Sequence, residues 1–199
     1  ECEIAQGKAG HGQSPVRYWM HANMLTMNGQ RMSKSTGNYI LPMQLVSGDN
    51  SFFEKPFPPA VIRFCFMQAH YRSVLDISNE AMLAAEKGYN RLMEALKAVN
   101  TLTTDLEHPT GFSAAIDELK EKCYAALLDD FNAPMLIAHL FEAVKWIFAV
   151  KNGEDKFCIS DLETLRSLMN SFVGEVLGLQ DVASQEASGD TLDGVMQLL

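Results

Sequence analysis

A cationic pentapeptide rich in hydroxyl groups, Arg31-Met32-Ser33-Lys34-Ser35, is the stretch of this chain best suited to chemistry. Lysine supplies a mobile point charge with three donors, arginine supplies a planar fork, and hydroxyl and loop N–H groups add further donors. The small turn-forming residues Thr36-Gly37-Asn38 follow, so the backbone can bend closely around a ligand. The pattern indicates a site for a polyanion such as the phosphates of a nucleotide. By composition alone, a solvated loop would be the more common explanation.

The residues before the pentapeptide predict a β-hairpin that would position it. Met24-Leu25-Thr26-Met27 is typical of a short strand, and Asn28-Gly29 is the favoured pair for a tight hairpin turn. Gln30-Arg31-Met32 then begins the return strand. We therefore expect the cationic loop to leave the end of a hairpin, with one end anchored and the other able to move.

Length, charge and cysteine content narrow the class of protein. The 199 residues are enough for one core or two small ones, and the formal charge of −9 argues against a generally basic nucleic-acid binder without excluding a local basic patch. The cysteines form no CxxC pair, which favours buried thiols in a reducing, cytoplasmic location over a disulfide scaffold. No signal peptide and no uninterrupted apolar stretch long enough to cross a bilayer is apparent, so we expect no membrane partner.

Apolar periodicity predicts a mainly α protein in which the hairpin and loop precede an antiparallel helical bundle. Before the bundle, we expect a loop at 5–15, a strand or helix at 16–22, one or two helical turns at 41–46, a linker or boundary at 47–59 and a buried helix at 60–69. The bundle helices are expected from 78 to about 101, from about 113 to a turn at 129–134, from there to about 151, and from 160 to Gly178.

Side-chain patterns predict how the bundle helices begin and which faces they bury. Ser78 and Asn132 are candidate N-caps, Phe131 and Leu136 have the spacing of a hydrophobic staple, and Ser160 with Glu163 resembles a capping box. The residues expected to face inward are Met82, Ala85, Tyr89, Leu92, Leu96, Val99, Ile116, Leu119, Cys123, Leu127, Phe141, Trp146, Phe148, Leu162, Leu165, Met169, Phe172 and Val176. Residues 181–190 are polar without a core pattern and are expected to form a flexible linker.

The pentapeptide resembles the KMSKS signature of class I aminoacyl-tRNA synthetases, with Arg31 in place of the first lysine. Five stretches resemble cysteinyl-tRNA synthetase in particular, and they occur in the right order along the chain. They are Glu1-Cys2-Glu3-Ile4-Ala5-Gln6, Tyr18-Trp19-Met20-His21, Lys34-Ser35-Thr36-Gly37-Asn38, Ala69-His70-Tyr71-Arg72-Ser73 and Leu128-Asp129-Asp130-Phe131-Asn132-Ala133-Pro134. Ordered matches of this kind are far more specific than a single short string.

The resemblance implies a cysteine–tRNA ligase. Such an enzyme uses ATP, with magnesium, to activate cysteine as cysteinyl-adenylate, and then transfers the cysteinyl group to tRNA(Cys). By this resemblance Lys34 contacts the ATP phosphates and, with Arg31, serves catalysis by stabilising the charge that develops on the leaving phosphates. Met32, Ser33 and Ser35 would complete the ATP-binding loop, and the serines either donate to the nucleotide or shape the turn.

A zinc ion that binds the substrate thiolate and favours it over a serine hydroxyl is also implied by the resemblance. Glu3 matches the family's glutamate ligand, whereas Cys2 matches a position that is not a ligand. The other zinc ligands and the second nucleotide signature, HIGH, would lie upstream of residue 1. We therefore expect the chain to be an internal piece of a longer protein that holds no zinc by itself, binds ATP poorly and is inactive alone.

The expected domain organisation has four segments. Residues 1–40 would end a Rossmann-type class I catalytic domain, 41–76 would connect, 77–180 would form a bundle resembling the family's DALR-type domain, and 181–199 would be a polar linker and the start of a truncated helix. The bundle would contact tRNA. Its cations Arg91, Lys97, Lys120 and Lys122 would meet phosphates if they share a face, although an ordinary solvated surface is at least as good an explanation. We expect a monomer.

Two other functions fit parts of the sequence. A related ligase activates cysteine with the same apparatus but transfers it to the amine of an amino sugar, and the stretch at 128–134 disfavours it because this stretch resembles the tRNA ligase. A non-enzymatic helical module that binds RNA or protein would require the pentapeptide match to be accidental, which the ordered stretches disfavour.

Overall fold

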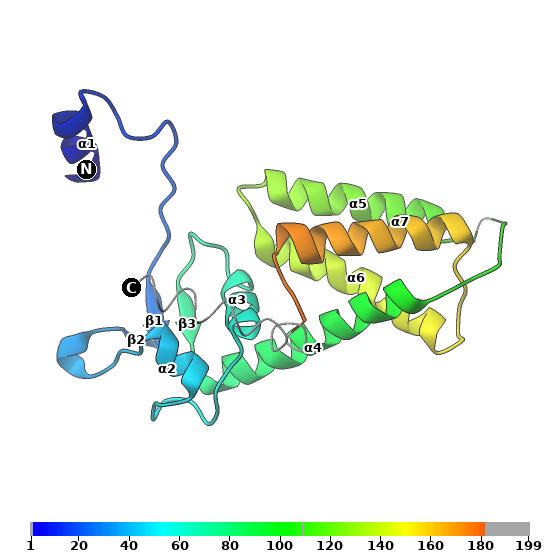
Figure 1. Ribbon diagram of the computed structural model, residues 1–199, viewed down its shortest axis with the longest axis horizontal. Coiled ribbons are helices and arrows are strands. Elements are labelled where there is room, and N and C mark those ends of the chain that lie inside the picture. Colours follow the sequence, from blue (N-terminus) through cyan, green and yellow to red (C-terminus); the bar gives the residue numbers. More distant parts are fainter. Residues whose placement is uncertain (1, 109, 182–199) are drawn as a thin grey trace, which may run out of the picture.

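The computed structural model describes residues 2–108 and 110–181, in which a small sheet with short helices is followed by four longer helices (Figure 1). The first part comprises α1 (Cys2–His11), β1 (Leu25–Met27), β2 (Gln30–Arg31), the single 3-10 turn η1 (Lys34–Thr36), α2 (Pro42–Ser47), α3 (Pro59–Met67) and β3 (Leu75–Ile77). The second part comprises α4 (Asn79–Thr101), α5 (Ser113–Leu128), α6 (Ala133–Lys151), α7 (Ile159–Met169) and its π-helical continuation η2 (Asn170–Val176). The prediction of a mainly α fold with a hairpin before a bundle is confirmed.

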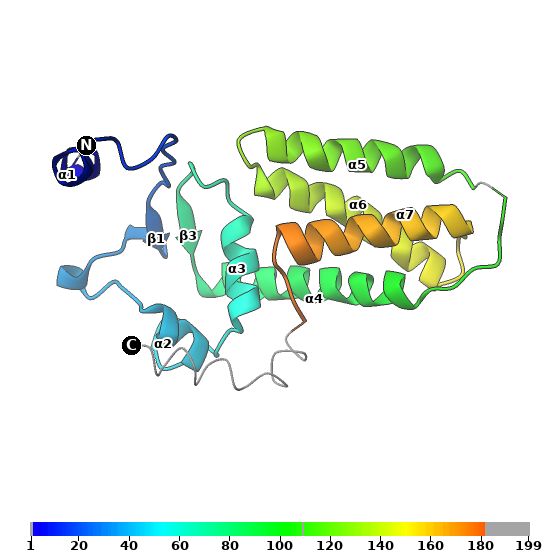
Figure 2. The same cartoon turned by 45° about the horizontal axis from the view of Figure 1, so that its top comes forward.

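The four longer helices bury their apolar stripes against one another. α5 contacts α6 and α7, and α4 contacts the same two helices, so a common core lies among them (Figure 2). Most of the residues predicted to face inward are buried there: Met82, Ala85, Tyr89, Leu92, Val99, Ile116, Leu119, Cys123, Leu162, Leu165, Met169 and Phe172. Leu96 and Leu127 are half-buried at the margin of this core.

One inward prediction was wrong, and three others hold only in part. Val176 is 45% exposed, because residues 170–176 form a π-helix whose wider turn changes the angle between successive side chains. The aromatic residues Phe141, Trp146 and Phe148 of α6 are only half-buried. The fully buried face of α6 is aliphatic and consists of Leu136, Ile137, Leu140, Ala143, Val144 and Ile147.

α6 is also long and apolar enough, by length and composition, to cross a membrane. Its aliphatic face packs against α4 and α5, and Arg91 and Lys151 lie over the ring of Phe148 at 5.7 Å and 5.4 Å. These contacts are those of the core helix of a bundle, in which the rings at the margin cover the core and meet cations.

Two of the predicted caps are present. The Ser78 hydroxyl accepts a hydrogen bond from the N–H of Ala81 at 3.2 Å, and the Asn132 side chain accepts from the N–H of Met135 at 3.3 Å. The capping box at Ser160 was wrong, because α7 begins earlier, at Ile159. There the Ser160 hydroxyl lies 3.2 Å from Cys158 Sγ instead of capping the helix.

The staple across Asn132 was wrong as well. Phe131 is 61% exposed, so its ring does not pack on the buried Leu136.

The segment before β1 departs from prediction. A loop was expected at 5–15, but α1 continues to His11, with Glu3 in its first turn and the basic Lys8 and His11 in its last. These charges complement the helix dipole, and alanine and glutamine favour the helix locally despite the two glycines. Residues 16–22 were expected to be strand or helix and form neither. α1 has no buried residue and lies apart from the rest of the described chain in both views (Figures 1 and 2).

The sheet has three strands in the order β2-β1-β3 within the described residues. β1 pairs antiparallel with β2 as the hairpin predicted, and parallel with β3, which was not predicted, with Leu25 opposite Leu75 and Met27 opposite Ile77. α2 and α3 occur close to where they were expected, and α3 buries Ala60, Val61, Phe64 and Cys65. Residues 48–58 have no regular structure, yet Phe53 and Phe57 lie in the core.

One connected cluster of buried residues extends from Met27 in the sheet to Leu179 after the bundle. The sheet and the bundle therefore share a core instead of being separate bodies. Asp181, expected to begin a linker, forms an ion pair with Lys97 of α4. The rest of that predicted linker and the start of the truncated helix predicted within 181–199 lie outside the described residues, as does Glu1.

Candidate functional site

The hairpin that carries the cationic loop is built by its turn. Asn28 has a φ of 53° and Gly29 a φ of 72°, the left-handed values that a tight hairpin turn needs at both central residues. Asp76 of β3 fixes this turn from the side, because its Oδ1 accepts from the Thr26 hydroxyl at 2.6 Å and from the Gly29 N–H at 2.8 Å. The carboxylate therefore ties the hairpin to the neighbouring strand. This role of Asp76 was not predicted.

The loop itself closes on a narrow base. The Ser33 N–H donates to the Asn38 carbonyl at 2.8 Å, and the residues between form the 3-10 turn η1. Gly37 ends this turn with a φ of 72°, where its N–H donates to the carbonyl of Lys34 at 3.2 Å. The Ser33 and Ser35 hydroxyls are 2.7 Å apart and bonded to each other. In this geometry the serines shape the turn, which is one of the two roles considered for them.

Asn38 anchors the loop to the hairpin. Its side-chain amide lies within hydrogen-bond distance of three hairpin carbonyls, those of Met27 at 3.4 Å, Gln30 at 3.3 Å and Arg31 at 3.2 Å. Asn38 stood in one of the stretches that carried the family resemblance, but no role was predicted for it. Its position directly after Thr-Gly, where the loop returns to the strand, was the available signal.

The structure gathers the predicted nucleotide-binding residues in this one loop. Met32 is half-buried and packs against the core, which holds the start of the loop in place. Lys34 and Arg31 are exposed, and neither side chain makes a hydrogen bond or ion pair with any residue that the structure describes. Both cations are therefore available to an anionic ligand, on a backbone that is held at its base.

Glu3 is not part of this arrangement. It is exposed on α1, which lies apart from the hairpin in both views (Figures 1 and 2). Residues 2–108 and 110–181 contain no group of three or more histidine, cysteine, aspartate or glutamate side chains that could hold a metal ion. The residues present therefore do not make up a zinc site, and no chemical step is derived through zinc.

The cysteines behave as the sequence indicated for buried thiols. Cys65 and Cys123 are buried, and burial raises the pKa of both. The pKa of Cys123 reaches about 11, first through burial and then through the nearby charge of Glu142. Neither thiol is therefore prepared to act as a nucleophile or metal ligand.

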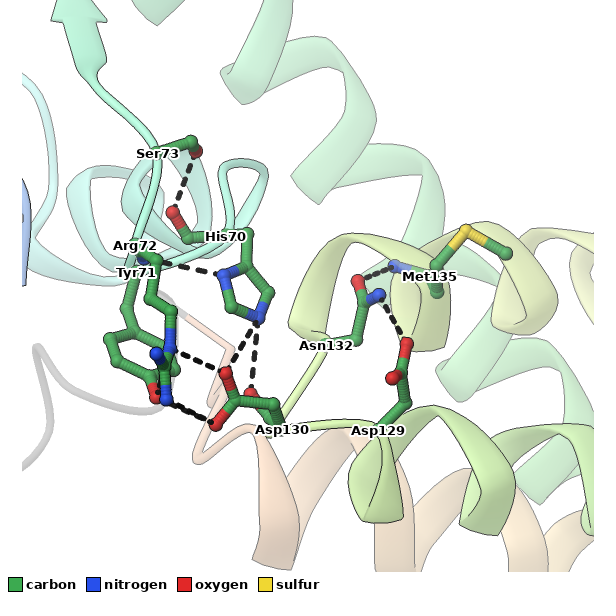
Figure 3. Close-up of polar contacts among 8 residues, drawn as sticks. All are labelled: His70, Tyr71, Arg72, Ser73, Asp129, Asp130, Asn132 and Met135. Atoms are coloured by element: carbon green, nitrogen blue, oxygen red, sulfur yellow. Dashed lines mark hydrogen bonds and ion pairs between the residues drawn. The ribbon is translucent and has the colours of Figure 1, made fainter.

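Two of the stretches that resembled the family meet in space (Figure 3). His70, Tyr71 and Arg72, in the turn between α3 and β3, contact Asp130 in the turn between α5 and α6. The hydrogen bond from the Tyr71 hydroxyl, followed by the bond and charge of Arg72, holds the pKa of the Asp130 carboxyl below its usual value. Hydrogen bonds with Tyr71 and Asp130, together with the charge of Asp130, raise the pKa of the Arg72 guanidinium. The Asp130 carboxylate and the Arg72 guanidinium therefore both stay charged across the physiological range.

The bundle cations proposed to meet phosphates have different surroundings. Lys120 lines a groove between α5 and α7, where Glu163 also lies, whereas Lys122 forms ion pairs with Glu118 and with Glu142 of α6. The other two are also engaged, since Lys97 pairs with Asp181 and Arg91 lies over Phe148. The contact of these four residues with phosphates therefore stays a prediction.

Comparison with known proteins gives two family matches. Residues 1–87 match the catalytic domain of tRNA synthetases class I (C), and residues 122–181 match the DALR domain. The second match covers the turn before α6 and the helices that follow it.

Curated relatives match over the whole chain. It is 44% identical over 200 residues to the cysteine–tRNA ligase of Porphyromonas gingivalis and 42% identical over 204 residues to that of Parabacteroides distasonis. It is 37% identical over 204 residues to the cysteine–tRNA ligase of Cytophaga hutchinsonii. Each alignment covers 100% of this chain but only 40% or 41% of the relative, so the chain spans about two fifths of their length.

Proposed function

Because the chain belongs to the cysteinyl-tRNA synthetase family of class I synthetases, we propose that it supplies the ATP-phosphate loop and part of the tRNA-contacting helical domain of a cysteine–tRNA ligase. The whole enzyme activates cysteine with ATP and magnesium to cysteinyl-adenylate and pyrophosphate. It then transfers the cysteinyl group to tRNA(Cys).

The observation that carries the proposal is the anchored loop, whose two cations bond to none of the residues that the structure describes. In the activation step, negative charge builds up on the departing pyrophosphate. The Lys34 ammonium reaches that charge as a point donor with three N–H groups, and Arg31 adds a planar fork from the adjacent strand. Because Asn38 and the Ser33–Ser35 bond fix the turn beforehand, the loop loses little order when it engages ATP.

Substrate choice is proposed to depend on a zinc ion in the complete enzyme, where Glu3 would be one of several ligands. Zinc binds a thiolate more strongly than a hydroxyl, and this preference would distinguish cysteine from serine. Such a site needs further ligands, because one carboxylate does not hold zinc.

The two other functions considered from the sequence find no support. The curated relatives described above are all cysteine–tRNA ligases, and the DALR match falls on the helical part that an amino-sugar ligase was not expected to share. We further propose that the complete enzyme is a cytoplasmic monomer that needs no membrane.

The full-length protein tests the proposal through amino-acid-dependent exchange of pyrophosphate into ATP, followed by charging of tRNA(Cys). We expect exchange with cysteine, much weaker exchange with serine, and formation of cysteinyl-tRNA. A full-length protein that shows no cysteine-dependent exchange, or that transfers activated cysteine to an amino sugar but not to tRNA, would contradict the proposal.

A further inference from the structure

One cluster of polar side chains joins the sheet to the bundle and lies outside the cationic loop. The Tyr71 hydroxyl donates to Asp130 Oδ1 at 2.7 Å, and Arg72 Nε lies 2.6 Å from Asp130 Oδ2 (Figure 3). His70 Nε2 lies 3.1 Å from the backbone carbonyl of Asp130. Asp130 is therefore held on its side chain and on its backbone by three consecutive residues of the other part of the chain.

The same turn is bonded on its other side to the strand that leads to the cationic loop. The Asn23 N–H donates to the Tyr71 carbonyl at 2.9 Å, and the Asn23 side chain donates to the Arg72 carbonyl at 2.8 Å. Leu75 then continues directly into the parallel pairing of β3 with β1. A continuous series of hydrogen bonds thus connects the bundle, through residues 70–73, to the hairpin that presents Lys34.

The backbone at Asp130 has an uncommon conformation. Asp130 and Phe131 both have a φ of 55°, which non-glycine residues rarely adopt, and here two adopt it in succession. Burial of the Phe131 ring does not explain this, since the ring is 61% exposed. Hydrogen bonds from the N–H groups of Phe131 and Asn132 to carbonyls of α5 hold the turn in this form. Its visible consequence is that the Asp130 carboxylate points at Tyr71 and Arg72 (Figure 3).

We propose that Asp130, acting through Tyr71 and Arg72, is a positioning residue that fixes the bundle relative to the loop of Lys34, so that tRNA bound along the bundle brings its terminal ribose to the adenylate. This inference rests on the proposed function. It assigns Asp130 to the transfer step and not to activation, because no hydrogen bond or ion pair in the described structure joins the cluster to the cationic loop.

The positioning role of Asp130 can be measured separately from its effect on protein stability. The Asp130 side chain is 41% exposed and that of Arg72 is 65% exposed, and exposed ion pairs contribute little to the free energy of unfolding. Loss of the carboxylate charge should therefore leave the protein folded while the angle between bundle and sheet becomes less well defined.

The same turn provides a matched control. Asp129 precedes Asp130 directly, and its carboxylate accepts from the Asn132 side chain at 3.1 Å within the turn (Figure 3). No bond joins Asp129 to residues 70–73 in the described structure. D129N and D130N are thus the same chemical change at adjacent positions, and only D130N weakens the contact between the bundle and residues 70–72.

The experiment uses the full-length protein with the substitutions D130N, Y71F and D129N. For each variant we would measure cysteine-dependent pyrophosphate exchange, kcat and KM for tRNA in aminoacylation, and the midpoint of thermal unfolding. We expect D130N and Y71F to keep exchange and unfolding midpoint near those of the unchanged protein, while kcat/KM for tRNA falls by about tenfold to a hundredfold. D129N should match the unchanged protein in all three.

Two results would overturn the inference. In one, D130N and Y71F charge tRNA as well as D129N does. In the other, exchange, charging and unfolding midpoint fall together, which is the mark of a purely structural role. A full-length protein without cysteine-dependent exchange before any substitution would instead refute the proposed function, so the two failures are distinguishable.

Discussion

Within the cationic loop, individual side chains divide into those that build the loop and those that face solvent. Asn38, Ser33 and Ser35 are engaged in hydrogen bonds within the loop and hairpin, whereas Lys34 and Arg31 are exposed. The division follows from chemistry, since short polar side chains satisfy backbone groups nearby and long cationic ones extend beyond them.

The substitution N38A tests the anchoring role. It removes the amide that lies near three hairpin carbonyls, and we expect about 1 kcal/mol of lost stability, because the exposed carbonyls of Gln30 and Arg31 can turn to water instead. The loop would no longer be fixed before ATP binds, so kcat/KM for ATP in pyrophosphate exchange by the full-length protein should fall about tenfold or more.

The control for N38A is N90A, at an exposed asparagine of α4 whose side chain bonds to no described residue. N90A should leave the exchange reaction unchanged. If N38A and N90A gave equal rates, the anchoring role of Asn38 would be wrong.

The sequence identified the loop but not its supports. Arg31 to Ser35 were recognised because the string itself is specific and its chemistry is local. Asn38 and Asp76 were not, because their partners are defined only after the hairpin folds and β3 pairs beside it. A polar side chain in a short strand gives no sign of the donors that will face it from 47 residues away.

At the level of helices, one buried carboxylate joins two helix starts. Asp161, near the beginning of α7, is 4% exposed and accepts from the Ser113 hydroxyl at 2.7 Å and the Thr110 hydroxyl at 2.7 Å, where α5 begins. Burial opposes ionisation of this group, but hydrogen bonds from Ser113, Thr110 and Cys158 outweigh it and lower the Asp161 pKa. The ionised form is therefore the one that the fold favours.

Stability should depend on pH through Asp161. Because its pKa is lower in the folded state, its contribution is complete above the ordinary carboxyl pKa of about 3.9 and is lost as the pH falls through the folded value. We expect D161N to lower the free energy of unfolding by about 1–3 kcal/mol at pH 7, since Asn adds N–H groups where hydroxyls already donate. The difference should shrink at pH 3, as measured by urea unfolding of the chain.

D117N serves as the comparison, at an exposed aspartate of α5 whose side chain bonds to no described residue. Its effect should be small and independent of pH. A D161N effect as large at pH 3 as at pH 7 would show that the charge of Asp161 is not what stabilises the two helix starts.

The helices also show where sequence patterns predict well. Ser78 and Asn132 were correctly predicted as caps because a cap is local and involves residues three apart. Ser160 was not a cap, since its hydroxyl is hydrogen-bonded to the Cys158 thiol and α7 begins at Ile159, before Ser160. α1 was missed because its two glycines suggested a loop, whereas charge placement favours a helix that buries nothing.

In the whole molecule, the sheet and the bundle share one hydrophobic core. A single cluster connects Met27 of the sheet with the bundle, and Phe57 contributes to it from an irregular segment with 0% exposure. The segment at 47–59 was predicted to be a linker from its prolines and glycine, and its backbone is indeed irregular. Its two buried phenylalanines show that proline and glycine predict an irregular backbone but do not predict whether the neighbouring side chains are buried.

Truncation of Phe57 tests whether the irregular segment at 48–58 is part of the shared core. We expect F57A to cost about 3–5 kcal/mol in the free energy of unfolding, because a fully buried ring leaves a cavity. The same change at the 61% exposed Phe131 should alter it by less than about 0.5 kcal/mol. Urea unfolding of the chain measures both, and an effect of F57A near that of F131A would mean that the irregular segment is not part of the core.

The bundle helices and the hairpin were predictable and the third strand was not, for a physical reason. Helix stripes repeat over several turns, so the sequence of α4, α5 and α7 shows which side is buried. β3 has only three residues and pairs with β1 across 50 positions, and such a short strand leaves no periodic pattern. The contact of residues 70–72 with Asp130 could not be predicted from the sequence, because it depends on both parts of the chain being in place.

Lys34 is the residue proposed to contact the ATP phosphates, and pyrophosphate exchange by the full-length protein with K34A tests this role most directly. Loss of the ammonium should lower kcat by about a hundredfold to a thousandfold, because the charge on the departing pyrophosphate loses its donor. K87A, at an exposed lysine of α4 with no bonded partner in the described structure, should exchange at the unchanged rate. If K34A activated cysteine as fast as K87A does, the loop would not be the ATP-phosphate site.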